Sequence, residues 1–169
     1  MNKKALFQLS YGVYIVCSQY EENFSGCIIN TTTQITAEEK PKISIAVNKE
    51  NYTNALIQKS KKANISVLLQ TTPFEFIGKF GFRTGREFNK LDGTNYKMGT
   101  NKIPVITENT SAYLECSVLE SIDVGTHTLF ILEVDDAEIL EENSVLTYDY
   151  YHNVIKGKTP PKASTYQGN

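Results

Sequence analysis

The sequence lacks the residue groupings on which most metal and hydrolytic chemistry depends. Its three cysteines, Cys17, Cys27 and Cys116, are widely spaced and form no C-x-x-C pair, and its two histidines, His127 and His152, have no acidic pair at metal-ligand spacing. A zinc or iron site is therefore not expected. No serine lies in a G-x-S-x-G sequence, so triad hydrolysis has no support either.

The chain also lacks a long hydrophobic run and a strong charge of either sign. No window approaches the ~18 uninterrupted apolar residues that a membrane span requires, so we expect no membrane association. Seventeen basic and nineteen acidic residues give a formal net charge of -2, and there is no long basic stripe, which disfavours nucleic acid as a partner. Gln8 and Ser10 interrupt the first apolar stretch, which argues against a secretory signal. With isolated, reduced cysteines, the expected location is the cytoplasm.

What the chain does contain fits one mainly β domain over residues 1–169. Its 169 residues, 40% of them hydrophobic, can bury a core without disulfides, and no repeat or linker divides them. Strands are predicted at residues 14–18, 24–29, 42–47, 65–69, 112–118 and 129–132, and helices at residues 54–62 and 73–80.

The connections between these strands predict an antiparallel, closed or partly closed barrel. A polar connection of hairpin length joins the first two strands, and Asp123-Val124-Gly125 turns the chain between the last two. Period-two alternation in 112–118 predicts a half-buried strand, with Ala112, Leu114, Cys116 and Val118 facing the core. Residues 147–152 are β-prone, and residues 156–161 are typical of an extended, solvated tail.

Two groups of small polar residues follow apolar strands at the points where the chain leaves the core. The first group comprises Asn30, Thr31, Thr32, Thr33 and Gln34. The second group precedes a helix and comprises Asn48, Lys49, Asn51 and Thr53. Hydroxyls, a lysine and the unpaired amides of a helix start suit a phosphate, so a phosphorylated cofactor is the leading hypothesis.

Each group also has an explanation that needs no ligand. Threonine favours strands, so residues 30–34 are equally well explained as a polar edge strand. In the second group, Asn51 or Thr53 is explained by capping of the following helix. The position of both groups at the ends of neighbouring strands is what favours a binding site.

Residues 80–90 and His127 are further candidates. The glycines of 80–90 permit close backbone approach, and Arg83, Arg86 and Lys90 could meet a phosphate; alternatively this is a surface loop with solvated basic residues and phenylalanines pinned to the core. His127 follows a turn at the start of a predicted strand. It could contact the edge of a nicotinamide or flavin, or merely donate to a carbonyl.

The order of motifs over nearly the whole chain resembles that of a known family. The motifs are Gly26-Cys-Ile-Ile-Asn-Thr-Thr-Thr, residues 42–47 with Asn51 and Thr53, Phe80-Gly-Phe-Arg-Thr-Gly-Arg, Leu114-Glu-Cys, Gly125-Thr-His and Pro161-Lys-Ala-Ser-Thr-Tyr. This order is similar to that of the flavin reductase-like, FMN-binding split-barrel proteins. Within that group the chain most resembles the flavoredoxins and the flavin domain of high-molecular-weight rubredoxin.

The resemblance implies a six-stranded antiparallel split β-barrel with short helices, working as a homodimer with FMN near the subunit boundary. It implies that the flavin ring is bound by Asn30, Thr31 and Thr32. It implies that the phosphate is bound by Thr33, Gln34, Asn48, Lys49, Asn51 and Thr53. The loop that closes over the cofactor corresponds to Phe82, Arg83 and Thr84.

One motif departs from the family. The family often has Gly-Asp-His where this chain has Gly125-Thr126-His127. The resemblance still implies a nicotinamide contact by His127, the expected catalytic residue, but no role for an acidic neighbour.

The function implied is an FMN-binding oxidoreductase that passes electrons from NADH or NADPH through FMN to a protein or small-molecule acceptor. FMN supplies the redox chemistry, so the lack of an acid-base pair is expected. The alternative is a non-catalytic, flavoredoxin-like FMN electron carrier reduced by a partner protein. Because the chain has no cysteine pairs for iron, a rubredoxin-like acceptor would be a separate protein. A third alternative, resting on fold alone, is a plain binding module for nucleotides or oligomers.

Overall fold

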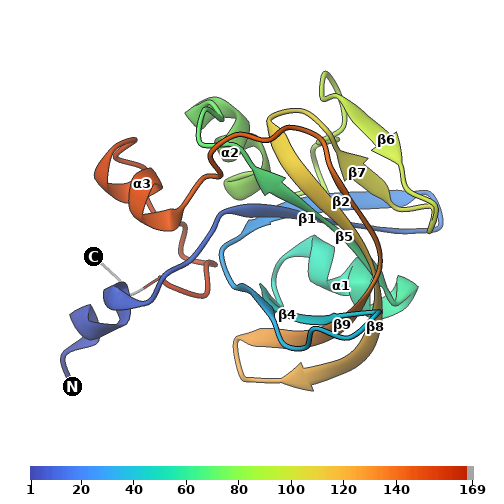
Figure 1. Cartoon of the computed structure of the whole chain (residues 1–169), viewed down its shortest axis with the longest axis horizontal. Helices are drawn as coiled ribbons and strands as arrows, with labels where there is room; N and C mark the ends of the chain where they lie inside the picture. The colour runs from blue at the N-terminus through green and yellow to red at the C-terminus, as the bar shows by residue number, and fades with distance from the viewer. Residues whose placement is uncertain (167–169) are drawn as a thin grey trace.

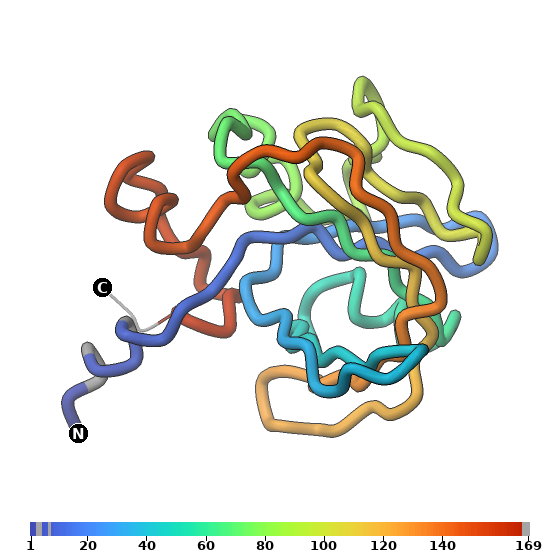
Figure 2. Tube along the Cα trace, viewed as in Figure 1, coloured from blue at the N-terminus to red at the C-terminus, as the bar shows by residue number. Residues whose placement is uncertain are grey.

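The structure is a computed structural model that describes residues 1–166, apart from the side chains of Lys3, Lys4 and Phe7 (Figures 1 and 2). The strands are β1 Tyr14–Tyr20, β2 Asn23–Ile29, β3 Thr32–Gln34, β4 Lys42–Asn48, β5 Lys62–Leu68, β6 Tyr96–Met98, β7 Pro104–Ile106, β8 Thr110–Asp123 and β9 His127–Ile139. The helical segments are a 3₁₀ turn at Lys3–Gln8, α1 Tyr52–Ser60, α2 Phe74–Gly81 and α3 Tyr148–Asn153.

The main sheet is antiparallel and curls without closing. It has seven strands in the order β2-β1-β5-β8-β9-β4-β3, and a second sheet pairs β6 with β7 (Figure 1). The predicted split barrel is thus confirmed, with one strand more than the six expected because Thr32–Gln34 pairs with β4. The β1–β2 and β8–β9 pairs are the antiparallel pairs expected from the connecting turns. Since β2 and β3 are the two edges, a gap separates β2 from the β3–β4 pair.

Strand β1 serves two hydrophobic cores because both of its faces are buried. Val16 points into the curl of the sheet, where it joins Ile57 of α1 and Phe130 of β9. Ile15 and Cys17 point outward into a second cluster, which α2, β7 and α3 cover. Apolar residues at successive positions of β1 are what permit this two-sided burial. Helices α1 and α2 form where the sequence predicted helices, and α2 begins directly after Pro73.

The prediction that β8 is half-buried is wrong. Leu114, Cys116 and Val118 do pack on the inner core, but Tyr113 and Glu115 on the opposite face are also buried. The segment before β7 covers that face, and its Thr100 hydroxyl donates to the Glu115 carboxylate at 2.7 Å. The alternating pattern suggested that this face meets solvent. The Glu115 carboxylate is instead buried and accepts hydrogen bonds from protein donors.

The C-terminal predictions are also wrong. The β-prone stretch 147–152 is helical from Tyr148 onward, because the Thr147 hydroxyl caps helix α3 by accepting from the Tyr150 amide at 3.2 Å. The tail predicted to be solvated packs on this helix instead. Gly157 lies directly against the Tyr151 ring, with no room for a Cβ, and the Tyr151 hydroxyl donates to the Lys158 carbonyl at 3.1 Å.

The three cysteines are buried and unpaired, as the sequence predicted. Burial raises the pKa of each thiol, so all three are protonated at neutral pH. Within residues 1–166, no helix is long and apolar enough to cross a membrane.

Replacing Phe130 by alanine should test the importance of the inner core. Phe130 is fully buried on β9, so Phe130→Ala should lower the free energy of unfolding by about 3 to 5 kcal/mol. Urea unfolding followed by circular dichroism would measure this change. Leu119→Ala on the exposed part of β8 is the control and should change the free energy by less than about 0.5 kcal/mol. Equal losses in the two variants would contradict the assignment of the core.

Candidate functional site

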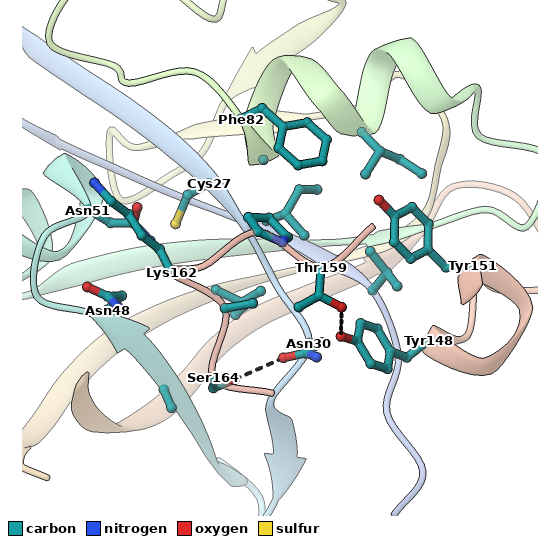
Figure 3. Close-up of a pocket in the computed structure, with 18 of the residues that line it drawn as sticks. Cys27, Asn30, Asn48, Asn51, Phe82, Tyr148, Tyr151, Thr159, Lys162 and Ser164 are labelled. Atoms are coloured by element: carbon teal, nitrogen blue, oxygen red, sulfur yellow. Dashed lines mark hydrogen bonds between the residues drawn. The ribbon is translucent and has the colours of Figure 1, made fainter. Parts of the chain in front are cut away.

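The candidate site is a pocket at the split of the barrel, between the ends of β2 and β4 (Figure 3). It encloses a cavity of ≈ 50 Å³. The strands and the residues next to them contribute Val13, Cys27, Ile28, Ile29, Asn30, Ala46, Asn48 and His127, and the helices and their ends contribute Asn51, Ile77, Gly81, Phe82, Tyr148 and Tyr151. The C-terminal segment contributes Thr159, Pro160, Lys162, Ala163 and Ser164. The site therefore has apolar and aromatic walls with a few polar groups, as ligand pockets generally do.

Strand register brings the polar groups of this pocket together. Asn48 at the end of β4 lies opposite His127 at the start of β9, so their side chains reach the pocket at the same level. Asn30 directly follows β2 and is buried. Asn51 stands at the N-cap of α1, and its side chain makes no capping hydrogen bond. Residues far apart in the sequence thus place three amides and an imidazole around one cavity.

His127 is the titratable group whose chemistry points most directly to a ligand. Its Nδ1 lies 2.8 Å from the Thr126 hydroxyl, while its Nε2 is buried without a hydrogen-bond partner. Burial lowers the pKa of His127, and the approach of the Lys162 backbone only partly opposes this shift. The ring is therefore neutral at pH 7. A buried polar nitrogen without a partner is costly, so it indicates a group that binds there.

Of the residues predicted at the first strand end, only Asn30 lines the pocket. The Thr31 hydroxyl bonds to the backbone of Ala46, 3.3 Å from both its nitrogen and its oxygen. The Thr32 hydroxyl is buried without a partner, while Thr33 and Gln34 lie exposed on the edge strand β3. These side chains surround the site rather than forming the cavity itself.

Lys49 is held away from the cavity by an ion pair. Its Nζ lies 2.5 Å from a carboxylate oxygen of Asp123 in the β8–β9 turn, and this contact is the main cause of the lowered pKa of Asp123. Both side chains are well exposed, and such surface pairs contribute only about 0 to 1 kcal/mol. A phosphate group could therefore recruit this lysine at little cost.

A second polar region lies at the start of α1, beneath residues 82–87. The buried Thr53 hydroxyl donates to the Ser25 hydroxyl at 2.9 Å. Gly85 packs against the same serine, since a Cβ there would come within 2.3 Å of its oxygen. Arg86 places its guanidinium 4.4 Å from the centre of the Tyr52 ring, in the first turn of the helix. A cation, hydroxyls and the first turn of a helix therefore meet here, which is a combination that suits an anion.

The other basic and polar residues of this loop have local partners. Arg83 lies over the Phe88 ring at 4.6 Å, and the Thr84 hydroxyl accepts from the Arg86 amide at 3.3 Å. Lys90, which the sequence suggested for a phosphate, is buried and donates to the carbonyls of Gly26 and Phe80 at 2.6 and 2.9 Å. That suggestion is wrong for Lys90, because its ammonium group is already used to hold the loop on β2.

Sequence reasoning missed Ser25, Tyr148 and the C-terminal segment. Ser25 lies inside an ordinary apolar strand, and nothing in its neighbours marks it. Tyr148 lies in a stretch that the sequence marks only as β-prone, and residues 156–161 were expected in solvent. The signal that could have placed them was the cluster of aromatic residues at 148–151, which offers an apolar surface for the following chain to cover.

The two histidines should make stability fall as the pH falls. Burial lowers the pKa of both His127 and His152 below the usual 6.5, so below that pH the unfolded chain takes up protons more readily than the folded one. The free energy of unfolding should thus decrease between about pH 7 and about pH 5, above the range where carboxylates titrate. Urea unfolding at several pH values would measure this. A variant with both His127→Gln and His152→Gln should show a flatter profile, and an unchanged slope would exclude the histidines as its source.

Comparison with known proteins identifies the family of the chain. A family model described as the flavin reductase like domain matches residues 6–155. Over 167 residues the chain is 46% identical to a ferric-chelate reductase (NAD(P)H) of Archaeoglobus fulgidus, and the alignment covers 98% of each chain. It is 42% identical to a high molecular weight rubredoxin of Moorella thermoacetica, covering 98% of this chain and 72% of that protein.

Solved structures extend the agreement to the fold. An FMN-binding protein from Thermus thermophilus superposes with a TM-score of 0.70 at 20% sequence identity, covering 78% of this chain and 72% of that one. At this identity the likeness concerns the fold alone, and it matches the split barrel described above. From the family match and the two relatives together, the chain belongs to the flavin reductase like domain family.

Proposed function

We propose that this protein is an NAD(P)H-dependent reductase that binds FMN in the pocket at the split of the barrel. The observation that carries the proposal is the buried, unpartnered Nε2 of His127 in a pocket whose other polar groups include the amides of Asn30, Asn48 and Asn51. Apolar and aromatic walls with polar groups at one end suit a flat heteroaromatic ring with a polar edge. The names of the relatives support the choice of electron donor and cofactor.

The phosphate end of the cofactor is proposed to lie at the start of α1. There the first turn of the helix, the Thr53 hydroxyl and the Arg86 guanidinium come together. Lys49 lies nearby and is held only by a weak surface ion pair with Asp123. The residues proposed to bind FMN remain those expected from the sequence: Asn30, Thr31, Thr32, Thr33, Gln34, Asn48, Lys49, Asn51, Thr53, Phe82, Arg83 and Thr84. Arg86 is added to them on structural grounds.

The protein's own part in the reaction is to bind, orient and exclude water. Bound FMN supplies the redox chemistry, accepting a hydride from the nicotinamide and passing electrons onward. The chain therefore needs no acid-base pair. His127 is proposed to contact the nicotinamide through its neutral imidazole, and the exposed Phe82 to cover the ring from the end of α2.

The acceptor and assembly are proposed from the relatives and the sequence resemblance. A ferric chelate is the acceptor in the name of the Archaeoglobus protein, so a small-molecule acceptor is one candidate. The rubredoxin relative favours a second candidate function, an FMN electron carrier that exchanges electrons with a rubredoxin-like protein. A homodimer with FMN near the subunit boundary and a cytoplasmic location complete the proposal.

The enzyme and the electron carrier can be separated by rapid mixing. Purified protein supplied with FMN should show a bound-flavin spectrum, and anaerobic stopped-flow mixing with NADH or NADPH should bleach it. A carrier would keep its colour with both nicotinamides and bleach only with a reduced partner protein. A protein that takes up no FMN would contradict both functions.

Replacing Lys49 should weaken FMN binding if this lysine reaches the phosphate. Loss of a charge-assisted bond of about 1.5 kcal/mol predicts an FMN dissociation constant about tenfold higher in Lys49→Ala. Fluorescence titration of the apoprotein would measure it. Lys42→Ala is the matched control, because Lys42 begins β4, which Lys49 directly follows, and it pairs with Glu38 instead.

A further variant tests whether Asp123 competes for Lys49. Asp123→Asn weakens the ion pair but keeps the side-chain shape, so FMN should bind as tightly as before or more tightly. An unchanged affinity in Lys49→Ala would place the phosphate elsewhere.

A further inference from the structure

The C-terminal segment Thr159–Thr165, here called the strap, crosses the mouth of the pocket. Five of its residues line the cavity, namely Thr159, Pro160, Lys162, Ala163 and Ser164 (Figure 3). The strap has internal turns, in which the Ala163 amide donates to the Pro160 carbonyl at 3.0 Å and the Tyr166 amide to the Ala163 carbonyl at 3.0 Å. It is therefore a shaped segment, and not an extended tail that merely passes the site.

Asn30 holds the strap with both ends of its side-chain amide. Its Nδ2 donates to the Thr165 hydroxyl at 2.7 Å, and its Oδ1 accepts from the Ser164 hydroxyl at 3.0 Å. Asn30 itself is buried, whereas its strap partners Ser164 and Thr165 are exposed and half-buried. The residue that directly follows β2 thus ties the strap across the split of the barrel.

Tyr148 holds both ends of the strap with a single hydroxyl. That hydroxyl accepts from the Thr165 hydroxyl at 2.7 Å and shares a hydrogen bond of 2.6 Å with the Thr159 hydroxyl (Figure 3). The Tyr148 ring is fixed in turn by an edge contact with His152 at 4.3 Å and by stacking with Tyr151 at 6.4 Å. Helix α3 is therefore the anchor on which the strap is fastened.

The spaces on the two sides of the strap differ greatly in size. The cavity between the strap and the sheet is ≈ 50 Å³. On its other side the strap borders a hollow of ≈ 1130 Å³, which Leu6 and Leu9 also line. The strap therefore narrows the mouth of the pocket, and the hollow on its other side gives it room to swing outward.

We propose that the strap is a movable wall of the cofactor site that opens to admit FMN and closes to retain it. The hydroxyls of Tyr148 and Thr165 set how long the cofactor stays, because they hold the closed position. This inference rests on the proposed function, since it assumes that the pocket binds the flavin. It makes FMN a retained cofactor and not a substrate released at each turnover.

The test uses two full-length variants that remove only hydroxyls. Thr165→Val breaks the bridge between Asn30 and Tyr148 at a residue that does not line the cavity, and Tyr148→Phe removes both bonds to the strap while keeping the ring. Each should raise the FMN dissociation rate about tenfold, as expected for the loss of two hydrogen bonds. Tyr150→Phe, on the same helix but away from the pocket, is the matched control and should leave the rate unchanged.

The dissociation rate would be measured by the recovery of flavin fluorescence after dilution of the loaded protein. A second readout reports the strap directly. Trypsin should release the peptide after Lys162 more slowly when FMN is bound, and this protection should be reduced in Thr165→Val. Urea unfolding of each variant would show that the fold is retained.

The possible failures are distinguishable. If wild type and variants bind no FMN, the proposed function fails. If all bind FMN and release it at the same rate, or if FMN gives Lys162 no protection, the proposed role of the strap is overturned while the proposed function stands.

Discussion

The arrangement of the site depends on one constraint, which is that the sheet curls but does not close. Because β2 and the β3–β4 pair remain apart, the ends of these strands face each other across a gap instead of pairing. Polar residues, which would be costly to bury inside a closed barrel, can lie at this gap. The register of β4 and β9 then fixes Asn48 and His127 at one level, and α1 begins directly beside them. The pocket is thus a consequence of the topology.

Much of the fold could be predicted from the sequence because the relevant signals are local. Apolar runs bounded by turn residues gave the hairpin of β1 and β2, and Pro73 marked the start of α2. The exceptions depend on contacts between distant residues. Glu115 lies on the outer face of β8, and its charge predicts exposure to solvent. It is buried because the segment that contains Thr100 covers it, a contact that the local sequence does not show. Helix α3 has β-prone residues, and its capping by Thr147 decides its conformation.

The candidate site could be predicted only in part from the sequence, because it too depends on contacts between distant residues. Asn30, Asn48, Asn51, Phe82 and His127 were predicted by type and position, and the structure brings them to one cavity. Which basic residue is free could not be predicted, because that depends on partners elsewhere in the chain. The Lys90 ammonium group is hydrogen-bonded to two backbone carbonyls. The Arg86 guanidinium, from the same loop, instead reaches Tyr52 at the start of α1. The closing of the pocket by the C-terminal segment required the coordinates.

The two-sided burial of β1 has a consequence for cooperativity. Val16 belongs to the inner core, while its neighbours Ile15 and Cys17 belong to the outer one, so neither core can melt without exposing the other. Helix α3, which anchors the strap, packs on the outer core, and the strands that form the pocket wall pack on the inner core. The two parts therefore unfold together. A substitution that destabilises α3 should therefore change the single thermal unfolding transition of the whole protein. It should not produce a separate transition for α3.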